Sequence, residues 1–444
     1  MDLTSRLRSI VRPAGAPARE LTYEPDTGRY EATVDLDRVA DVLGGRVITN
    51  GFGRTLVIDR RYESDRYHGA HRVGDCELRD GEGLRLLDPA LPGPEGCGTR
   101  ALFLDLETTG LSGGAGTVAF LIGCGWFDLG AFQVRQFLLP SYAAERALLG
   151  AAAECFDEAA LLVTYNGKTF DVPVMETRWL FHRMEIPLES VRHFDMLHPA
   201  RRLWRTRANA IDDGEAGCRL ATLERLLCGV TRVGDVPGLE IPSRFFRFLR
   251  SGDARPLEAV LEHNRLDLIS LAAVTAHAVR LVEDGEDSCR DAAEALALGR
   301  VYERADRMAR ALACFERAAS DSAADVELRA EALYRLGLRL RRERRFAEAA
   351  DASRRLLDLS DSSRRRRSAL LSALRQFAVE ALAIHHEHRK RDYAAAKALA
   401  MRLLDGDESA ARADAARHRI ARLERKLGQQ RLLGIEESGN CGIG

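Results

Sequence analysis

Residues 101–285 alternate between two patterns of apolar and polar positions. Compact apolar runs bounded by turn residues are typical of strands, and they occur at 101–107, 117–129, 131–139, 161–167 and 191–197. Apolar residues spaced three and four apart predict helices at 143–156, 172–184 and 220–228, and a long amphipathic helix, with or without a break, at 256–283. A strand-rich opening followed by alternating strands and helices predicts a mixed sheet flanked by helices.

The segment before this region carries shorter strand-like runs. They lie at 29–36, 45–53 and 55–63 and are separated by Gly and Asp turns. Proline and glycine interrupt the pattern between 84 and 100, which predicts that a new domain begins near residue 97. The N-terminal part is therefore divided into a mobile tail (1–20), a strand-rich segment (21–96) and an α/β domain (97–285).

From about residue 290 the pattern is helical and repeats. Small and aromatic residues recur at the spacing of a tetratricopeptide unit, with a second copy 38 residues after the first. The positions are Leu298, Gly299, Tyr302, Ala311, Phe315 and Ala318, then Leu336, Gly337, Leu340, Ala349, Ser353 and Leu356, and in a partial third copy Ala396, Ala400 and Leu403. Residues 286–430 are predicted to stack as helical repeats that bind a protein partner, before a tail at 431–444; a generic helical bundle is the alternative.

Composition excludes several classes of protein. The chain is 46% hydrophobic and 30% charged, as soluble globular proteins are. No apolar run approaches the roughly 20 residues of a membrane span, and residues 1–20 lack the apolar core of a secretory signal. The nine cysteines show no CxxC pair. We expect a cytoplasmic protein with reduced, mostly buried thiols and no membrane association.

The type of positive charge is more informative than its total. The net charge is −1, and only four of the 66 basic residues are lysines, so arginine clusters carry little information in this chain. Lys168 is the only lysine among the first 389 residues. Its presence is therefore not explained by the bias towards arginine.

An Asp-x-Glu pair stands at the end of the first strand of the α/β domain. Alternate side chains of a strand point to the same face, so Asp105 and Glu107 place two carboxylates side by side. Such neighbours repel unless cations lie between them, and Mg²⁺ and Mn²⁺ prefer carboxylate oxygens. A solvent-exposed strand end before a turn is the alternative for the pair taken alone.

Three further residues favour a metal site. Asp171 follows a strand and opens a helix, where an acidic residue is also favoured for its interaction with the helix dipole. His263 and Asp267 stand four apart, so on a helix they share one face. Four carboxylates in this chain order can hold two divalent ions about 3.5 to 4 Å apart for in-line phosphodiester hydrolysis. Histidine side chains can take up and release a proton near neutral pH, so His263 suits a general base.

The chain resembles the DEDD exonuclease superfamily, which has a ribonuclease-H-like fold, and within it the YprB-type predicted exonucleases. The motifs that carry the resemblance occur in the expected order between about 100 and 275: DLETTGLSGGAGTVAFLIG, YNGKTFDVP, FDMLHPARRLW, CRLATLE, DVPGLEIP and EHNRLDLISL. The resemblance implies an α/β ribonuclease-H-like domain with a tetratricopeptide-like tail. It also implies metal ligands at Asp105, Glu107, Asp171 and Asp267 and a base at His263.

One spacing departs from the wider superfamily. Its histidine-type members place the histidine five residues before the last aspartate, and its tyrosine-type members place a tyrosine four residues before it. Here His263 stands four residues before Asp267, at the tyrosine spacing. The function of His263, as base or as ligand, therefore stays open.

Candidate substrate contacts lie at the turns that follow the strands. Thr108 could hold a terminal nucleotide, although turn chemistry is an equal explanation. Asn166 and Lys168 stand beside Asp171, where the ammonium could bind a phosphate or balance the acids. Asp195 is expected to support the ligands from outside the metal site. The runs RRLWRTR (201–207) and RFFRFLR (244–250) interleave arginine with aromatic residues as single-strand grooves do, but amphipathic helices that face the core explain them better.

These features favour a Mg²⁺- or Mn²⁺-dependent nuclease that uses two ions. The resemblance implies 3′-to-5′ exonuclease activity, with single-stranded DNA or RNA as the expected substrate. A nucleic-acid-binding scaffold that does not cut is one alternative, and a structure-selective endonuclease on the same metal core is another. Retention of the acidic cluster argues against the scaffold, because binding alone does not need it.

Overall fold

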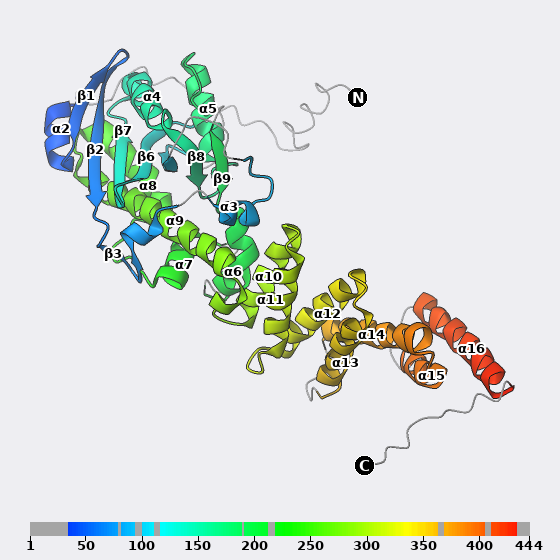
Figure 1. The fold of residues 1–444 in the computed structure, drawn as a ribbon. Helices are drawn as coiled ribbons and strands as arrows, with labels where there is room; N and C mark the ends of the chain where they lie inside the picture. The colour runs from blue at the N-terminus through cyan, green and yellow to red at the C-terminus, as the bar shows by residue number, and fades with distance from the viewer. Residues whose placement is uncertain are drawn as a thin grey trace, which may run out of the picture.

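The computed structural model of the chain describes residues 34–78, 81–93, 100–110, 116–188, 191–211, 218–362, 368–404 and 410–432. The tail predicted at 1–20 lies outside them, as does the tail predicted at 431–444 except for its first two residues. Figure 1 shows an α/β part from which a row of helices extends towards the C-terminus. This arrangement confirms the predicted fold class, an α/β domain followed by an all-helical region.

A seven-stranded mixed sheet forms the centre of the α/β part, in the order β1-β2-β7-β6-β5-β8-β9. Its strands are β1 (Arg46–Asn50), β2 (Gly53–Tyr62), β5 (Arg100–Thr108), β6 (Ala119–Asp128), β7 (Ala131–Leu138), β8 (Ala159–Thr164) and β9 (Arg192–Asp195). Neighbours from β1 to β5 are antiparallel, whereas β5, β8 and β9 run parallel. The carboxyl ends of β5, β8 and β9 therefore meet at one edge. A separate two-stranded ribbon joins β3 (Tyr67–His68) to β4 (His71–Arg72).

Strands β1 and β2, from the strand-rich segment before residue 97, belong to this same sheet. Strand β2 pairs with β7 from Leu56 opposite Leu138 to Tyr62 opposite Phe132. The predicted boundary near residue 97 therefore does not separate two sheets. These pairs join residues at least 70 positions apart, which local sequence patterns do not reveal.

The first described residues correct one strand prediction. The run at 29–36 enters the described chain at Val34, and helix α2 (Leu36–Leu43) begins two residues later. The carboxylate of Asp35 accepts the backbone N–H of Arg38 at 3.2 Å, which caps this helix. The last residues of this run therefore form the N-terminal cap and the start of a helix instead of a strand.

Helices cover both faces of the sheet (Figure 1). One apolar cluster joins the sheet to α2, α4 (Glu145–Ala153), α5 (Asp171–Phe181) and α8 (Ile241–Ser251). A second joins it to α3 (Glu82–Leu87), α6 (Leu197–Ile211), α7 (Leu220–Leu223) and the π-helical turn Glu224–Cys228. The arginine runs at 201–207 and 244–250 lie on α6 and α8. Leu203 and Trp204 in the first run, and Phe245, Phe248 and Leu249 in the second, are buried, so the amphipathic-helix explanation is confirmed for both.

The long helix predicted at 256–283 is the unbroken α9 (Glu258–Asp284). Val260 and Leu261 belong to the first apolar cluster, whereas the apolar residues from Leu268 onward belong to the second. The helix thus passes from one core to the other. Between these two groups lie His263 and Asp267, the residues of this helix that the sequence singles out.

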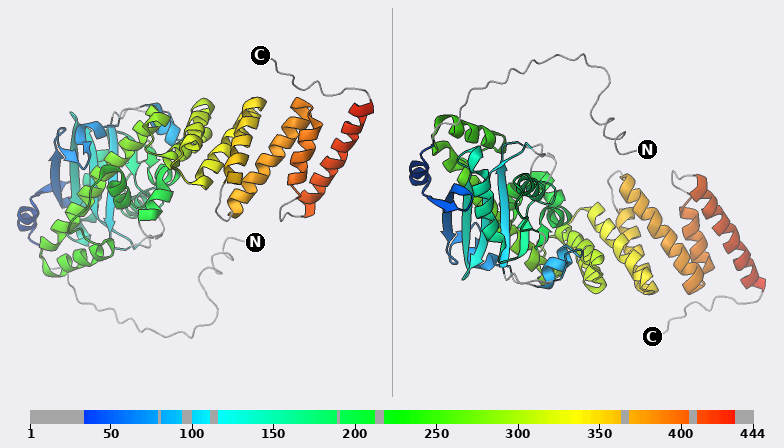
Figure 2. Two further views of the ribbon diagram at one scale, coloured as in Figure 1. Left: turned by 90° about the horizontal axis from the view of Figure 1, so that it is seen from below. Right: turned by 90° about the horizontal axis from the view of Figure 1, so that it is seen from above.

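The C-terminal region is a row of helices in which each packs against the next (Figure 2). They are α10 (Ala292–Arg304), α11 (Met308–Ser320), α12 (Val326–Arg342), α13 (Phe346–Ser362), α14 (Ala369–His385), the π-helical turn His386–Lys390, α15 (Tyr393–Arg402) and α16 (Ala410–Leu432). The positions predicted from the first two repeat copies are all buried. The all-helical region is confirmed, and its assignment as tetratricopeptide-like stays a prediction.

The two parts are joined by specific contacts as well as by a shared apolar cluster. The indole Nε1 of Trp204 in α6 donates to Glu294 Oε1 in α10 at 2.8 Å. The hydroxyl of Tyr302 in α10 donates to the carbonyl oxygen of Val282 in α9 at 2.8 Å. Both bonds are buried, so they fix the first helix of the row on the α/β part.

The thiols follow the sequence expectation where the structure describes them. The seven cysteines within the described ranges are buried and free; Cys97 and Cys441 lie outside those ranges. In the same ranges, every helix is too short or too polar to cross a bilayer.

Candidate active site

Strand β5 carries the first two acids at its carboxyl end. Asp105 and Glu107 point to one face, and Leu104 and Leu106 point to the other, where they are buried in the first apolar cluster. The pairing with β6 shifts register between Glu107 and Thr108. The strand therefore ends directly after the two carboxylates.

Asp171 is the first residue of α5 and is only 6% exposed. Its carboxylate accepts the backbone N–H of Leu106, on the strand that carries Asp105 and Glu107. Strand β8 pairs with β5 only as far as Phe103, so this N–H lies beyond the paired part. The hydrogen bond brings the third acid to the same edge of the sheet.

Helix α9 brings His263 and Asp267 to this edge on one helical face. The Nε2 atom of His263 lies 3.4 Å from Oδ2 of Asp267. The next residue, Asn264, is fully buried and donates through Nδ2 to Oδ2 of Asp105 at 2.7 Å and to the Asp105 carbonyl oxygen at 3.2 Å. The Asn264 amide thus joins α9 directly to β5, the strand that carries Asp105 and Glu107.

The four acids lie close together, and the pKa values of Asp105, Glu107 and Asp171 are raised. Burial and then the charges of Asp267, Glu107 and Asp171 raise the pKa of Asp105 well above its ordinary value, and the Asn264 bond only partly offsets this. Burial and then Asp267 and Asp171 do the same to Glu107. Burial, with the charges of Asp195 and Asp267, raises the pKa of Asp171 to about 7. The structure thus gathers four carboxylates that repel one another.

Asp235 lies on the other side of the histidine ring. Its Oδ1 atom is 2.7 Å from Nδ1 of His263. Burial acts to raise the pKa of Asp235, but the His263 bond and the charge of Arg232 outweigh it and the net pKa is lowered. The imidazole is therefore held between two carboxylates, one on each ring nitrogen.

Arg232 links these groups through a buried guanidinium whose side chain is 7% exposed. It donates to Glu224 Oε2 at 2.7 Å, to Asp235 Oδ2 at 3.2 Å and to Asp267 Oδ1 at 2.6 Å. Burial lowers the pKa of Arg232, but the carboxylates of Asp267 and Glu224 raise it by more. The guanidinium therefore stays charged and balances part of the acidic cluster.

A glycine in the sheet makes room for Asn264. Gly123 in β6 lies opposite Asp105, and a Cβ atom there would come within 2.2 Å of Asn264 Oδ1. Gln136 of β7, the partner of Gly123 on its other side, donates through Nε2 to Asn264 Oδ1 at 2.8 Å and to the Leu261 carbonyl oxygen at 2.9 Å. The buried amides of Gln136 and Asn264 thereby fix the first turns of α9 on the sheet.

The remaining predicted residues surround the loop between β8 and α5. The carboxylate of Asp195 accepts the backbone N–H groups of Asn166 at 2.8 Å and Lys168 at 3.0 Å. Asn166 adopts a left-handed conformation (φ 69°), and its side chain is exposed. The Lys168 ammonium pairs with Asp88 at 3.4 Å. Asp195 thus shapes this loop, and the lysine is balanced by an acid other than the four at the sheet edge.

Thr108 lies at the turn after β5 and is 6% exposed. Its hydroxyl donates to the carbonyl oxygen of Gly110 at 2.8 Å. The hydroxyl of Thr109 accepts the N–H of Val118 at 3.1 Å. In this conformation both hydroxyls stabilise the turn.

Within the described ranges, no three His, Cys, Asp or Glu side chains are arranged around one point as ligands of a metal ion. Two of the acids hold other partners, because Arg232 binds Asp267 and Asn264 binds Asp105. The chemistry of the donors nevertheless fits hard divalent cations. The four carboxylates are crowded, partly buried and repel one another, and cations between them would relieve this repulsion.

Sequence reasoning missed Arg232, Asp235, Asn264 and Gly123. Asp235 opens the DVPGLEIP motif, and an acid before a Pro-Gly turn has many explanations. Asn264 follows His263 directly, and Gly123 interrupts an apolar strand, which signals a close approach of another group. No local pattern joins these positions, since the contacts connect segments far apart in the sequence.

Two comparisons with known proteins place the chain in a family. A family model described as the RNase_H superfamily matches residues 102–279, from β5 to α9. The chain is also 32% identical over 327 residues to the uncharacterized protein YprB of Bacillus subtilis (strain 168), and the match covers 73% of this chain and 74% of that protein.

Proposed function

The chain belongs to the YprB family and carries a domain of the ribonuclease H superfamily, and from this premise we propose that it hydrolyses phosphodiester bonds in nucleic acid. One observation carries the proposal: strand β5, the start of α5 and helix α9 bring four carboxylates together at one edge of the sheet, where burial and the neighbouring negative charges raise the pKa of Asp105, Glu107 and Asp171. A fold does not need such a cluster, because unrelieved repulsion between buried acids destabilises it.

Asp105, Glu107, Asp171 and Asp267 are the residues that would hold two Mg²⁺ or Mn²⁺ ions. Bound there, the ions supply an activated water and stabilise the negative charge that develops on the leaving oxygen. The protein supplies the alignment of the four carboxylates. The Asn264 amide orients Asp105, and the Leu106 N–H orients Asp171.

We assign the general base to His263. Its Nε2 atom faces the acidic cluster, and its Nδ1 atom faces Asp235. With the N–H of Nδ1 donating a hydrogen bond to Asp235, Nε2 is free to accept a proton from the attacking water as the new P–O bond forms and the bond from phosphorus to the leaving oxygen breaks. Asp235 then stabilises the imidazolium until the proton passes to solvent.

The substrate proposed is single-stranded DNA or RNA, cut from the 3′ end. Asn166 and Lys168, on the loop that Asp195 holds in place, are the proposed contacts to the strand, and Thr108 is a further one at the turn after β5. The side chain of Lys168 is 37% exposed, so a phosphate in solution can approach it. The helical row is proposed to be a tetratricopeptide-like module that binds a protein partner.

End-labelled oligonucleotides test the activity and its direction. With Mn²⁺ present, a 5′-labelled single strand should give a ladder of shortening fragments, and a 3′-labelled strand should release its label as a mononucleotide from the start. DNA and RNA versions define the substrate. Internal cuts at single-strand to duplex junctions would favour the endonuclease, and binding without cleavage in either metal would favour the scaffold.

A further inference from the structure

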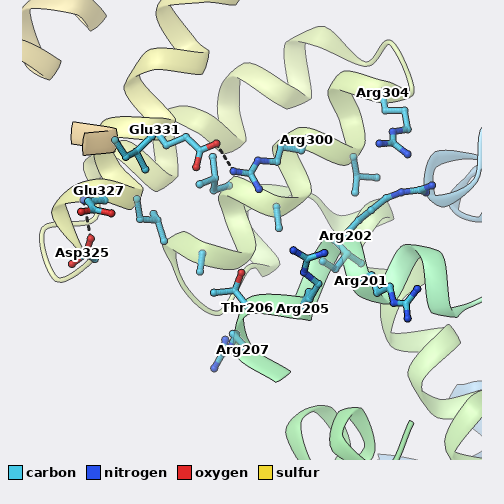
Figure 3. Close-up of a pocket in the computed structure, with 17 residues that line it drawn as sticks. Arg201, Arg202, Arg205, Thr206, Arg207, Arg300, Arg304, Asp325, Glu327 and Glu331 are labelled. Carbon is cyan, nitrogen blue, oxygen red and sulfur yellow. Dashed lines mark hydrogen bonds and ion pairs between the residues drawn. The ribbon is translucent and has the colours of Figure 1, made fainter. Parts of the chain in front are cut away.

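A second candidate site lies where the helical row meets the α/β part. A hollow of about 510 Å³ opens between α6 on one side and α10 and α12 on the other (Figure 3). Six arginines line it: Arg201, Arg202, Arg205, Arg207, Arg300 and Arg304. Three acids accompany them, Asp325, Glu327 and Glu331, and none of the catalytic acids takes part.

The positive charge of this hollow is only partly compensated. Arg300 pairs with Glu331, and Arg207 pairs with Asp291 at 2.7 Å. Among the residues that the structure describes, Arg201, Arg205 and Arg304 make no ion pair with a carboxylate, and all three are exposed.

Arg202 adds to this excess of positive charge. Its guanidinium donates to the carbonyl oxygen of Leu87, a neutral acceptor, at 2.9 Å, and the nearby carboxylate of Asp88 offsets its charge only in part. Burial, together with the like charge of Arg304, lowers the pKa of Arg202. Guanidinium groups from two facing helices are thus crowded at one place.

This cluster is informative even in an arginine-rich chain, because the arginines of the helical row are otherwise commonly paired. Glu303 binds both Arg335 and Arg339, Asp361 binds Arg375 and Arg402, and Glu316 binds Arg355. Surplus arginine by itself would be expected to find such partners. Their absence in a concave site points to an anion that the protein does not itself supply.

The walls of the hollow are held rigidly. Trp204 of α6 does not line the hollow; it is buried and donates to Glu294 of α10. The arginines therefore project from two helices whose relative position is fixed. A preorganised set of guanidinium groups suits phosphate oxygens, which accept their paired N–H donors.

From this arrangement we infer that the hollow binds the phosphodiester backbone of a nucleic-acid strand outside the catalytic site. Arg201 and Arg205 stand about one helical turn apart, so one face of α6 can contact a strand at two points. The lining residues within the described chain include no aromatic side chain on which a base could stack. Binding is therefore insensitive to base sequence. This inference rests on the proposed function for its ligand class.

The test measures binding by the full chain in EDTA, so that no cleavage occurs. Fluorescence anisotropy of a labelled single-stranded oligonucleotide is followed at several salt concentrations for wild type and Arg205→Gln/Arg304→Gln. We expect affinity to fall by about tenfold or more, since each lost bond is to a charged group. The slope of log K against log salt should shrink by about 1.4, at about 0.7 per lost phosphate contact.

The matched control removes the same charge elsewhere. Arg342 on α12 and Arg425 on α16 are exposed and do not line the hollow, so Arg342→Gln/Arg425→Gln should leave both affinity and slope close to wild type. Thermal melts of both variants establish that they fold.

An unchanged affinity in Arg205→Gln/Arg304→Gln overturns the inference, and so does an equal loss in the control. Binding of an acidic or phosphorylated peptide in the hollow, without binding of an oligonucleotide, also overturns the inference. A chain that binds through these arginines yet cleaves nothing in Mn²⁺ supports the inference and contradicts the proposed function. The binding of a strand in the hollow and the proposed nuclease activity are therefore tested independently.

Discussion

At the scale of single residues, the imidazole of His263 has a carboxylate on each ring nitrogen. Asp267 belongs to the four-acid cluster, whereas Asp235 is not one of the proposed metal ligands. Because the proton on Nδ1 decides whether Nε2 is free to act as a base, Asp235 is a positioning residue for His263.

We predict that Asp235→Asn lowers kcat by about 10- to 100-fold while the KM for the oligonucleotide and the affinity for Mn²⁺ stay near wild type. The amide can present either an oxygen or an N–H to Nδ1, so the ring loses its fixed tautomer. Steady-state kinetics and a Mn²⁺ titration measure these quantities. Asp253→Asn removes an exposed acid that pairs with Arg255, and it serves as control.

The effects of substituting Asp235 and His263 on the cleavage rate should not be additive. Since Asp235 acts through His263, the double variant Asp235→Asn/His263→Gln should be no slower than His263→Gln alone. Losses that multiply would show that Asp235 acts by another route. A large loss of Mn²⁺ affinity in His263→Gln would instead make the histidine a metal ligand.

Asp171 gives a prediction about pH. Its pKa is raised from 3.8 to about 7, so its contribution to stability is fully present below about pH 4 and is lost as the pH rises through about 7. In EDTA at pH 8, Asp171→Asn should be more stable than wild type by about 1–2 kcal/mol. The difference in the free energy of unfolding between the variant and wild type should become smaller as the pH falls below about 7.

Paired thermal melts of the two proteins measure this difference. The comparison removes the effect of the buried histidines His68, His193 and His277, whose pKa values are lowered to about 4 in both proteins. Mn²⁺ at pH 8 should stabilise wild type and close the gap. A variant less stable than wild type at pH 8 would contradict the account.

The sequence was most informative for residues whose chemistry depends on local spacing. Asp105 and Glu107 two apart on a strand, and His263 and Asp267 four apart on a helix, could be placed on shared faces from periodicity alone. Arg232, Asp235 and Asn264 could not, because each acts through contacts with a distant segment. The same limit applies to Lys168, whose partner Asp88 lies 80 residues earlier.

At the scale of elements, α9 is the part that most determines the site. Its apolar residues belong to the first apolar cluster before residue 262 and to the second after residue 267. Between them, His263, Asn264 and Asp267 make the contacts with the acidic site. Its length and amphipathic pattern were readable from the sequence. Its anchoring by Gln136 and Asn264 was not, because that depends on Gly123 in a neighbouring strand.

Two repeat glycines give an element-scale prediction with a built-in control. A Cβ atom on Gly299 would come within 2.5 Å of the Phe315 ring, whereas one on Gly337 would meet its neighbours at 3.5 Å or more. Gly299→Ala should destabilise the chain by roughly 1–3 kcal/mol through overpacking. Gly337→Ala should be neutral or stabilising by up to about 1 kcal/mol, because alanine favours the helix.

Chemical denaturation measures both changes. Equal effects of the two substitutions would mean that the first helix pair does not need its close approach. The repeat register was predicted from the sequence, in which Gly299 and Gly337 hold the same position of their repeats and cannot be told apart. Only the packing around each one separates them.

At the scale of the whole molecule, the chain combines a sheet-edge acidic cluster with a rigidly attached row of helices. The α/β order and the helical row were predicted because each depends on local periodicity. The entry of β1 and β2 into the central sheet was not, since β2 pairs with residues at least 70 positions away. The hollow between α6 and α10 was also beyond the sequence, which showed only that Arg201 to Arg207 lie on one helix.

The most direct test of the central claim compares wild type, Asp105→Asn and Asp128→Asn, in which the last removes an exposed acid on the neighbouring strand β6. Mn²⁺-dependent cleavage of a labelled single strand is measured beside thermal stability in EDTA. The account predicts that Asp105→Asn loses roughly a thousandfold or more in rate while its melting temperature equals or exceeds that of wild type. Asp128→Asn should cleave normally. Cleavage by Asp105→Asn at the wild-type rate would contradict the assignment of the four-carboxylate site.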